Sequence, residues 1–381
     1  MHVVVKLSKF CNLRCTYCYE YEELSDRSLM PLPDVARFLD SLGEAWASGE
    51  RGPIDLVLHG GEPLLLPFEY LRSVVGEARR SIEGRGVRLS ISVQSNLTRM
   101  DENVLALLEE LDIGLGVSFD VLGEERRFLP GKSATDTVLD NLQFLVDRGA
   151  IASRRMGGIS VLHAGNADRV VDLYRFWSGV GMDFRLLPYF SFVGEDARTA
   201  HLPMTHDATV RALLEVYQAW IEDGLPVRVY PVENYFDAAV RHLSGRWAPP
   251  LDPEVSEWAV IVNTNGDAYN YGDAYLPDGY WGNVFHSGVA EILAGPERRR
   301  TIEIRDARAV TCRQCPYDGA CSRVPIVEAV PSERAYDAAG NLVCSIARPV
   351  IDAIAASLAA QPSLQNSLAR RRAADQEPIL R

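Results

Sequence analysis

The sequence predicts an α/β protein, a partial (β/α)6 barrel of the TIM type followed by a small, loop-rich C-terminal domain. Short β-rich runs alternate with longer helical patterns through the first half of the chain. This alternation indicates parallel strands joined by helical crossovers. A stretch rich in proline and glycine at 244–256 then separates the barrel half from the end of the chain. In such a barrel, the chemistry is expected at the carboxyl ends of the strands.

The barrel elements are expected in regular order. Strands are expected at 2–7, 54–59, 87–93, 113–119, 157–163 and 183–187. Helices are expected at 33–48, 67–82, 101–111, 134–148, 167–180 and 206–223. The first helix carries an apolar stripe of helical period at Val35, Phe38, Leu39 and Leu42. Ser133 or Thr135 is expected to cap the helix at 134–148.

The sequence of the second half predicts shorter helices and strands. An extended segment is expected near 226–231, and a hairpin over 258–275 that turns at Asn265-Gly266. A closing helix at about 348–360 leads into a tail that contains Arg370, Arg371 and Arg372. The expected domains are therefore a barrel at 1–190, a helical bridge at 191–250, a cysteine-containing domain at 251–346, and a C-terminal helix and tail at 347–381.

Composition excludes several classes of protein. A chain of 381 residues with 47% hydrophobic residues can bury an ordinary soluble core. Its apolar runs are too short to span a bilayer, and the first residues do not have the pattern of a signal peptide. The net charge of −13 argues against a nucleic-acid partner. We therefore expect a cytoplasmic protein that binds neither membrane nor nucleic acid.

Seven cysteines fall into a group of three and a group of four. The first group is Cys11, Cys15 and Cys18, and the second is Cys312, Cys315, Cys321 and Cys344. In the reducing cytosol, clustered cysteines indicate metal or redox sites. Four thiolates complete the shell of a [4Fe–4S] cluster, so three would leave one iron open to another ligand. Structural zinc fits the first group poorly, because one loop supplies three ligands without a nearby fourth.

The spacing of Cys11, Cys15 and Cys18 after a predicted strand resembles the signature of the radical S-adenosylmethionine (radical SAM) superfamily. The resemblance implies that S-adenosylmethionine and a [4Fe–4S] cluster are bound there. In that family they generate a 5′-deoxyadenosyl radical, which abstracts a hydrogen atom from the substrate. Tyr17, between the cysteines, is then expected to shield the cluster and to contact the cofactor.

Three further segments are similar to cofactor-binding motifs of this family. The run HGGEP at 59–63 resembles its GGEP segment, which implies that Gly60, Gly61 and Glu62 meet the methionine of the cofactor. The run QSN at 94–96 resembles its QTN segment, which adds Gln94 and Asn96.

The third segment follows the fourth expected strand. Ser118 begins a run that resembles the family's S-x-D-G, with Val121 in place of the glycine. An arginine is expected to bind the carboxylate of the cofactor, because a guanidinium pairs with a carboxylate through two hydrogen bonds. Arg127 is the assigned candidate and Arg126 the alternative. A solvated loop is the structural alternative for both arginines and Asp120.

The second cysteine group taken alone fits a zinc ribbon or an iron–sulfur cluster equally well. Beside the first group, it resembles the SPASM branch of radical SAM enzymes, which carries auxiliary clusters. Tyr271 and Pro325 stand where that branch has further cysteines, which usually bind its inner auxiliary cluster. The resemblance therefore implies one auxiliary cluster, the second [4Fe–4S] cluster of the chain, on Cys312, Cys315, Cys321 and Cys344.

The catalytic base is expected near the same turn. Sulfatase-maturing members of the branch carry an aspartate where this chain has Gly272, which makes formylglycine formation unlikely for this chain. Asp273 and Asp267 are the remaining acidic candidates.

The resemblance implies an oxidoreductase that acts as a peptide maturase. It would abstract a side-chain hydrogen from a ribosomally made precursor peptide and form a cross-link, a cyclophane or related C–C bond. Expected partners are the precursor peptide and an electron donor such as flavodoxin or ferredoxin. The precursor would be recognised by the barrel and bridge or by a separate leader-binding protein. One alternative is a dehydrogenase or epimerase that acts on a small molecule such as a sugar alcohol. Another is a non-catalytic scaffold that binds zinc.

Overall fold

The computed structural model describes residues 1–47, 52–129, 131–153, 155–191, 197–255 and 257–360. Six parallel strands form its framework: β1 His2–Ser8, β2 Ile54–Gly60, β3 Leu89–Ser95, β4 Gly114–Ser118, β5 Met156–Leu162 and β6 Asp183–Pro188. Each pairs with the next in parallel. The fold class predicted from the sequence is confirmed, because β1 to β6 and their crossover helices form the predicted partial barrel.

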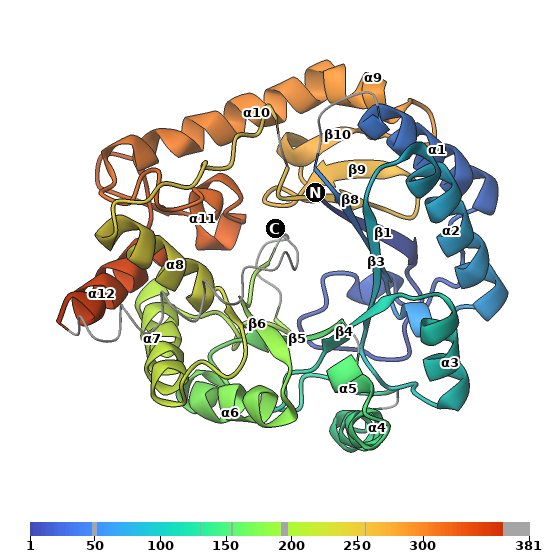
Figure 1. Ribbon diagram of the computed structural model, residues 1–381, viewed down its shortest axis with the longest axis horizontal. Coiled ribbons are helices and arrows are strands. Elements are labelled where there is room, and N and C mark those ends of the chain that lie inside the picture. The colour runs from blue at the N-terminus through green and yellow to red at the C-terminus, as the bar shows by residue number, and fades with distance from the viewer. Residues whose placement is uncertain (48–51, 130, 154, 192–196, 256, 361–381) are drawn as a thin grey trace.

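Helices surround the outside of this curved sheet (Figure 1). The crossover helices are α1 Leu32–Ala47, α2 Phe68–Ser81, α3 Glu102–Glu110, α4 Thr135–Asp147, α5 Ala150–Ser153 and α6 Val170–Val180, and α7 His206–Glu222 follows β6. The apolar stripe of α1 is buried as expected. The expected cap of α4 is wrong, because its N-cap is Ala134 and no side chain caps it. Ser133 instead accepts the N–H of Thr135 within the preceding turn.

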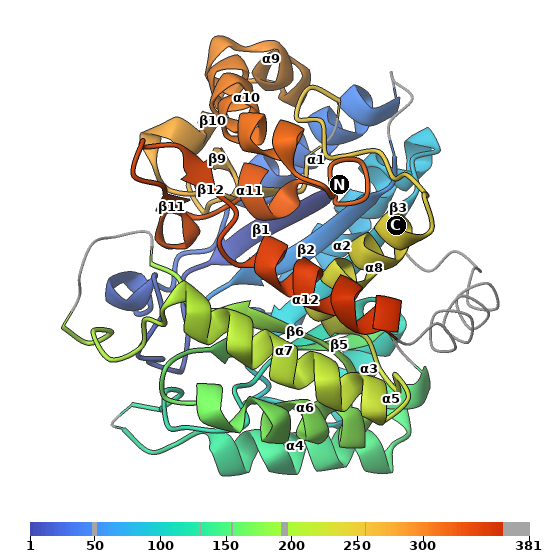
Figure 2. The same cartoon turned by 90° about the vertical axis from the view of Figure 1, so that its left-hand side faces the viewer.

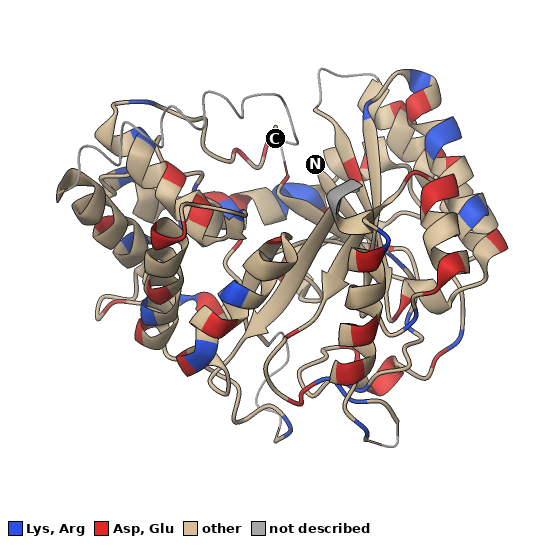
Figure 3. Cartoon of the chain, turned by 60° about the horizontal axis from the view of Figure 1, so that its bottom comes forward, with Lys and Arg blue, Asp and Glu red and all other residues tan. Residues whose placement is uncertain are grey.

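Short single-turn 3-10 helices connect several elements. They lie at Tyr21–Glu23, Pro63–Leu65, Glu83–Arg85, Ala167–Arg169, Pro277–Gly279, Val310–Gln314 and Pro331–Glu333. No helix of the described ranges combines the length and the apolar character that a membrane crossing requires. Acidic and basic residues are mixed along the outer helices (Figure 3).

The C-terminal half extends the barrel sheet. After β7 Val229–Tyr230 and α8 Val232–Leu243, the chain forms β8 Ala259–Val262, β9 Asp267–Asn270 and β10 Tyr280–Asn283. The predicted hairpin is confirmed, and Gly266 turns it with a φ of 88°. In addition, β8 pairs in parallel with β1, so the sheet order is β10-β9-β8-β1-β2-β3-β4-β5-β6-β7. The predicted domain division stays a prediction, and the sheet continues across it.

The remaining elements complete the described part of the C-terminal half. They are α9 Val289–Ala294, α10 Pro296–Ala309, α11 Val324–Val327, β11 Ala335–Tyr336, β12 Leu342–Val343 and α12 Ala347–Ala360. Helix α12 confirms the predicted closing helix and packs beside α7 and α8 (Figure 2). The expected tail at 361–381, with its three arginines, lies outside the described residues.

Helix α10 was not predicted, because charged residues occupy its buried face. Arg305 is fully buried and donates to the carboxylates of Glu257 and Glu328. Glu328 also accepts the backbone N–H of Gly272 at 3.0 Å. Such a helix has no apolar stripe, so hydrophobic periodicity cannot reveal it. A buried ion network thus joins α10, α11 and the segment after β9.

We predict that Arg305→Leu lowers the free energy of unfolding by about 3 kcal/mol or more, because it leaves two carboxylates buried without their cation. Arg300→Leu is the matched control on the same helix. Arg300 pairs with Asp278 at the surface, and loss of such a pair costs less than about 1 kcal/mol. Urea denaturation followed by circular dichroism measures both variants. Equal losses would contradict the role assigned to the buried network.

Candidate active site

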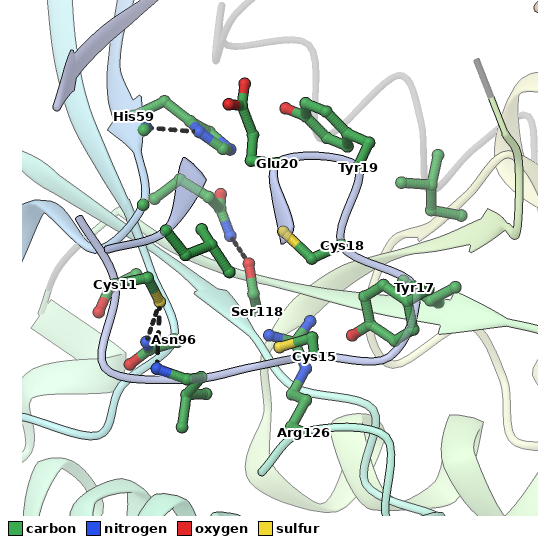
Figure 4. A pocket seen from close by; sticks show the side chains of 18 of the residues that line it. Cys11, Cys15, Tyr17, Cys18, Tyr19, Glu20, His59, Asn96, Ser118 and Arg126 are labelled. Atoms are coloured by element: carbon green, nitrogen blue, oxygen red, sulfur yellow. Dashed lines mark hydrogen bonds between the residues drawn. The ribbon is translucent and has the colours of Figure 1, made fainter. Parts of the chain in front are cut away.

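The three N-terminal cysteines line one cavity of about 170 Å³ at the carboxyl ends of the barrel strands. The loop after β1 supplies Cys11, Cys15 and Cys18, and Figure 4 shows their side chains around the same space. The ends of β2 to β6 supply most of the other walls, among them Gly60, Gly61, Gln94, Asn96, Ser118, Val161 and Leu187. The structure therefore brings together most of the cofactor-binding residues expected from the sequence.

Two glycines hold the cysteine loop against the end of β2. Gly61 donates its N–H to the carbonyl of Ser8 at 2.9 Å, and Glu62 donates to the carbonyl of Phe10 at 2.8 Å. A Cβ atom on Gly60 would lie 2.0 Å from the Ser8 oxygen, and one on Gly61 would lie 2.1 Å from the Phe10 oxygen. Neither distance is sterically possible, so both positions require glycine. The two glycines therefore have two roles: they let the end of β2 approach the backbone of the segment after β1, and they line the cavity.

Glu62 does not line the cavity, although the sequence assigned it to the cofactor. Its carboxylate is buried and accepts from Leu64 N at 2.9 Å, Ser95 Oγ at 2.9 Å and Asn96 N at 2.6 Å. Burial raises its pKa to about 7. These bonds join the segment after β2 to the end of β3, so in this structure Glu62 acts by positioning its neighbours.

Asn96, at the end of β3, reaches the cysteine loop. Its side-chain amide donates toward Cys11 Sγ at 3.6 Å and to Asn12 Oδ1 at 3.1 Å. Cys11 Sγ also accepts the N–H of Leu13 at 3.3 Å. Hydrogen bonds to ligand sulfurs tune the potential of iron–sulfur clusters. The surroundings of Cys11 therefore suit a thiolate ligand.

Gln94 and Ser118 face each other across the cavity wall. Gln94 Nε2 donates to Ser118 Oγ at 2.7 Å between β3 and β4. Gly116 makes room for this contact, because a Cβ atom there would lie 2.2 Å from Gln94 Oε1. The glycine in β4 thus explains how a long polar side chain fits on the inner face of the barrel.

A buried charged group forms the wall beside Cys15. Tyr17 donates its hydroxyl to Asp120 Oδ2 at 2.5 Å, and Arg126 Nε donates to the same oxygen at 3.2 Å. Asp120 Oδ1 accepts the N–H of Val161 at 3.0 Å. Burial raises the pKa of Tyr17 well above its usual value, so its hydroxyl stays protonated. The solvated-loop alternative for Asp120 is wrong, because the residue is only 4% exposed.

Arg126, and not Arg127, lies at the cavity. The sequence assigned the carboxylate-binding role to Arg127, but this side chain is 43% exposed and pairs with Glu124 outside the cavity. Arg126 lines the cavity, and its side chain is 12% exposed. The neighbouring positions point in opposite directions because the segment is extended, with Arg127 and Ser133 in a short bridge. The structure therefore corrects the assignment in favour of Arg126.

The first cysteine group has the donors that a cluster requires. All seven cysteines are free thiols. The pKa of Cys11 is raised to about 11 and that of Cys15 to about 12, mainly by burial and in part by the charge of the neighbouring Cys18. Among the described residues no group of His, Cys, Asp and Glu is arranged to hold a metal ion as it stands. Three mutually close thiols beside N–H donors nevertheless fit the thiolate ligation of a [4Fe–4S] cluster.

The four C-terminal cysteines also converge. The pKa of Cys312 is raised to about 12, mainly by burial and in part by the charges of Cys321, Cys344 and Cys315. The pKa of Cys344 is likewise raised to about 11, because burial outweighs the opposing effect of the N–H groups of Arg348 and Ala347. These N–H groups belong to the first turn of α12, where a helix favours a thiolate. The second group therefore fits a site with four thiolate ligands.

The two acidic candidates for the base lie outside the cavity wall. Asp273 is 1% exposed and pairs with Arg308 at 2.7 Å and with Arg334. These arginines outweigh the effect of burial and lower its pKa. Asp267 accepts from Asn265 at 2.7 Å and from Asn283 at 3.0 Å in the hairpin turn. Both carboxylates have structural partners, and neither lines the cavity, so the assignment as base finds no support in the geometry.

The sequence reasoning missed several residues of the cavity. Tyr19 and Glu20 line it beside His59, which begins the HGGEP run, and His59 Nδ1 accepts the N–H of Gly60 at 2.7 Å. Burial, together with the charge of Lys6, lowers the pKa of His59 to about 4, which keeps the imidazole neutral. Glu20 pairs with Lys6, which lies between the rings of Tyr19 and Tyr275 at 4.4 Å from each centroid. Only the alternation along β1 could have placed Lys6 on this inner face.

Residues 5–176 match the radical SAM superfamily. A cysteine-type anaerobic sulfatase-maturating enzyme of Clostridium perfringens (strain 13 / Type A) is 23% identical over 325 residues, which cover 82% of this chain and 85% of that enzyme. A serine-type anaerobic sulfatase-maturating enzyme of Bacteroides thetaiotaomicron is 19% identical over 351 residues, which cover 84% of this chain and 81% of that enzyme.

Two solved structures share the fold. The structure of native anSMEcpe with bound AdoMet and Cp18Cys peptide superposes with a TM-score of 0.71 at 17% identity, over 96% of this chain and 98% of that one. Streptococcus suis SuiB bound to S-adenosylmethionine superposes with a TM-score of 0.55 at 13% identity, over 84% of this chain and 70% of that one. At these identities the similarity shows the fold alone.

We predict that Arg126→Gln weakens binding of S-adenosylmethionine by roughly tenfold or more, because a charged hydrogen-bond donor to the carboxylate is lost. Arg127→Gln is the matched control, and its affinity should stay within about twofold of the unmodified protein. Isothermal titration calorimetry on anaerobically reconstituted protein measures both variants, with thermal melting as a check on folding. A larger loss in the Arg127 variant would reverse the assignment.

Proposed function

The chain carries a radical SAM domain at residues 5–176, and from this premise we propose that it is a radical SAM peptide maturase. It abstracts a side-chain hydrogen from a ribosomally made precursor peptide and forms a cross-link, a cyclophane or related C–C bond. The observation that carries the proposal is the convergence of Cys11, Cys15 and Cys18 on one cavity. Gln94 and Ser118 line the same cavity.

The described residues suit the expected cofactors. When bound, S-adenosylmethionine and a [4Fe–4S] cluster supply a radical able to abstract an unactivated hydrogen. The three cysteines would hold the cluster, and Arg126 would pair with the carboxylate of the cofactor. Leu13, also in the cavity wall, is fully buried and helps to exclude water from the site.

Two comparisons support a peptide substrate. Sulfatase-maturating enzymes align over more than four fifths of this chain, at 82% and 84%. One of the similar structures was solved with a bound peptide. Formylglycine formation is not proposed here, because Gly272 replaces the expected aspartate and Asp273 is held by two arginines. These residues therefore favour an oxidation of a peptide side chain other than formylglycine formation.

We also propose a second [4Fe–4S] cluster on Cys312, Cys315, Cys321 and Cys344. It would accept the electron that is left after the new bond has formed. A flavodoxin or ferredoxin would supply the electron that starts the reaction. The barrel and bridge, or a separate leader-binding protein, would recognise the precursor.

We predict that the anaerobically reconstituted protein binds about eight irons per chain. If a small precursor peptide is encoded beside its gene, we expect the protein, with reductant and S-adenosylmethionine, to remove the mass of two hydrogens from that peptide. Mass spectrometry measures the peptide, and chromatography measures release of 5′-deoxyadenosine. The Cys15→Ala control should release none, because the open cluster is lost.

Different outcomes separate the alternatives. An unchanged peptide mass with uptake of deuterium from solvent would indicate epimerisation instead of cross-linking. About four irons with one zinc per chain would contradict the auxiliary cluster. Release of 5′-deoxyadenosine by the Cys15→Ala protein would overturn the assignment of the first cysteine group.

A further inference from the structure

Arg185 lies on the inner face of the barrel. In β6 its neighbours Phe184 and Leu186 are buried on the opposite face, against the outer helices. Side chains alternate along a strand, so Arg185 shares a face with Leu187, which lines the active-site cavity. Two residues of strand span about 6.6 Å. The guanidinium therefore lies on the same inner wall as the cavity and within reach of a substrate that extends from it.

Aromatic rings hold Arg185 in place. Its guanidinium carbon lies 5.5 Å from the ring centroid of Tyr230, its partner in β7, and 6.0 Å from that of Trp258, which immediately precedes β8. These contacts join β6 and β7 to the segment that enters the C-terminal half. Rings orient a guanidinium by cation–π attraction without neutralising its charge. Arg185 thus stays a fixed and available cation.

Other buried or half-buried arginines have hydrogen-bond acceptors: Arg14 and Arg99 donate to the carbonyls of Cys11 and Leu64, and three more pair with carboxylates. Arg126 pairs with Asp120, Arg298 with Glu257, and Arg305 with Glu257 and Glu328. Within the described ranges, no carboxylate oxygen lies within ion-pair distance of Arg185. Half-buried Arg185 also has no hydrogen-bond acceptor among the described residues, and a charge without partners is costly away from water. The exception suggests that the missing anion comes from a ligand.

Two tyrosines add hydrogen-bond donors beside Arg185. The pKa values of Tyr235 and Tyr271 are raised by burial and lowered in part by the charge of Arg185, which places both near the guanidinium. Their hydroxyls therefore stay protonated. Glu333 also faces both tyrosines, and burial raises its own pKa. Tyr271 stands where the SPASM branch has a cluster-binding cysteine, so donors to an anion occupy the place of a lost ligand.

We propose that Arg185 binds a carboxylate of the substrate peptide, either an acidic side chain or the C-terminal carboxylate. A guanidinium matches a carboxylate in shape and can form two parallel hydrogen bonds with it. Anchoring the peptide at Arg185 places a nearby residue at the cavity, where the reaction occurs. This inference rests on the proposed function, because it specifies which peptides the same site accepts.

Binding of short peptides to the reconstituted protein with S-adenosylmethionine tests the proposal. Three peptide probes share the sequence Ala-Phe-Xaa-Phe-Ala and an acetylated N-terminus. The first has aspartate at Xaa and an amidated C-terminus, and the second has asparagine and an amidated C-terminus. The third has asparagine and a free C-terminal carboxylate. We expect one or both carboxylate probes to bind roughly tenfold more tightly than the neutral probe. The probe that gains affinity identifies the source of the carboxylate.

Variants show whether Arg185 causes the preference. Arg185→Gln should abolish it while leaving the affinity for the neutral probe unchanged, and Arg185→Lys should retain part of it. Arg211→Gln, at an exposed position of α7, is the matched control. Equal affinities for all three probes, or a preference that survives in Arg185→Gln, would overturn the proposal. Because binding is measured without turnover, failure of the cross-linking assay would leave this result interpretable.

Discussion

The site depends on one backbone contact, between the Gly60-Gly61 turn and the segment Ser8–Phe10. The turn ends β2, and the segment leads from β1 into the cysteine loop. Two N–H groups bond across the contact, and Cβ atoms at the glycines would overlap the carbonyl oxygens. The cysteine loop is thereby fixed to the sheet before any cofactor binds. Because the loop carries Cys11, Cys15 and Cys18, the shape of the cavity follows from this contact.

Buried charge organises the rest of the molecule. Glu62 holds β2 to β3, Asp120 holds the wall beside Cys15, and Arg305 links α10 to the segment after β9. Each of these groups has its partners, as burial of charge requires. Arg185 departs from this rule, and its side chain shares the inner face of β6 with Leu187 of the cavity wall. The contrast between these paired ions and Arg185, which has no carboxylate partner in the described part of the chain, distinguishes the framework from the proposed binding surface.

The sequence predicted the barrel strands and both cysteine groups, because strand patterns and cysteine spacing are local properties. It predicted the motif glycines but not that they contact the first loop, since that contact joins distant segments. It assigned the carboxylate-binding role to Arg127 and not to Arg126, because the spacing of residues does not show which way each side chain of an extended loop points. Helix α10 escaped detection because its buried face is charged. The parallel pairing of β8 with β1 was missed because the sequence of a four-residue strand does not indicate which strand it pairs with.

Substitution of Gly61 tests the central contact most directly. We expect Gly61→Ala protein to fold but to retain about four irons per chain, those of the C-terminal group, after anaerobic reconstitution. The displaced cysteine loop should also fail to bind S-adenosylmethionine. Gly76→Ala is the control, because no atom lies within 4 Å of the added methyl group in α2. If Gly61→Ala protein holds about eight irons and binds S-adenosylmethionine normally, the contact does not determine the site.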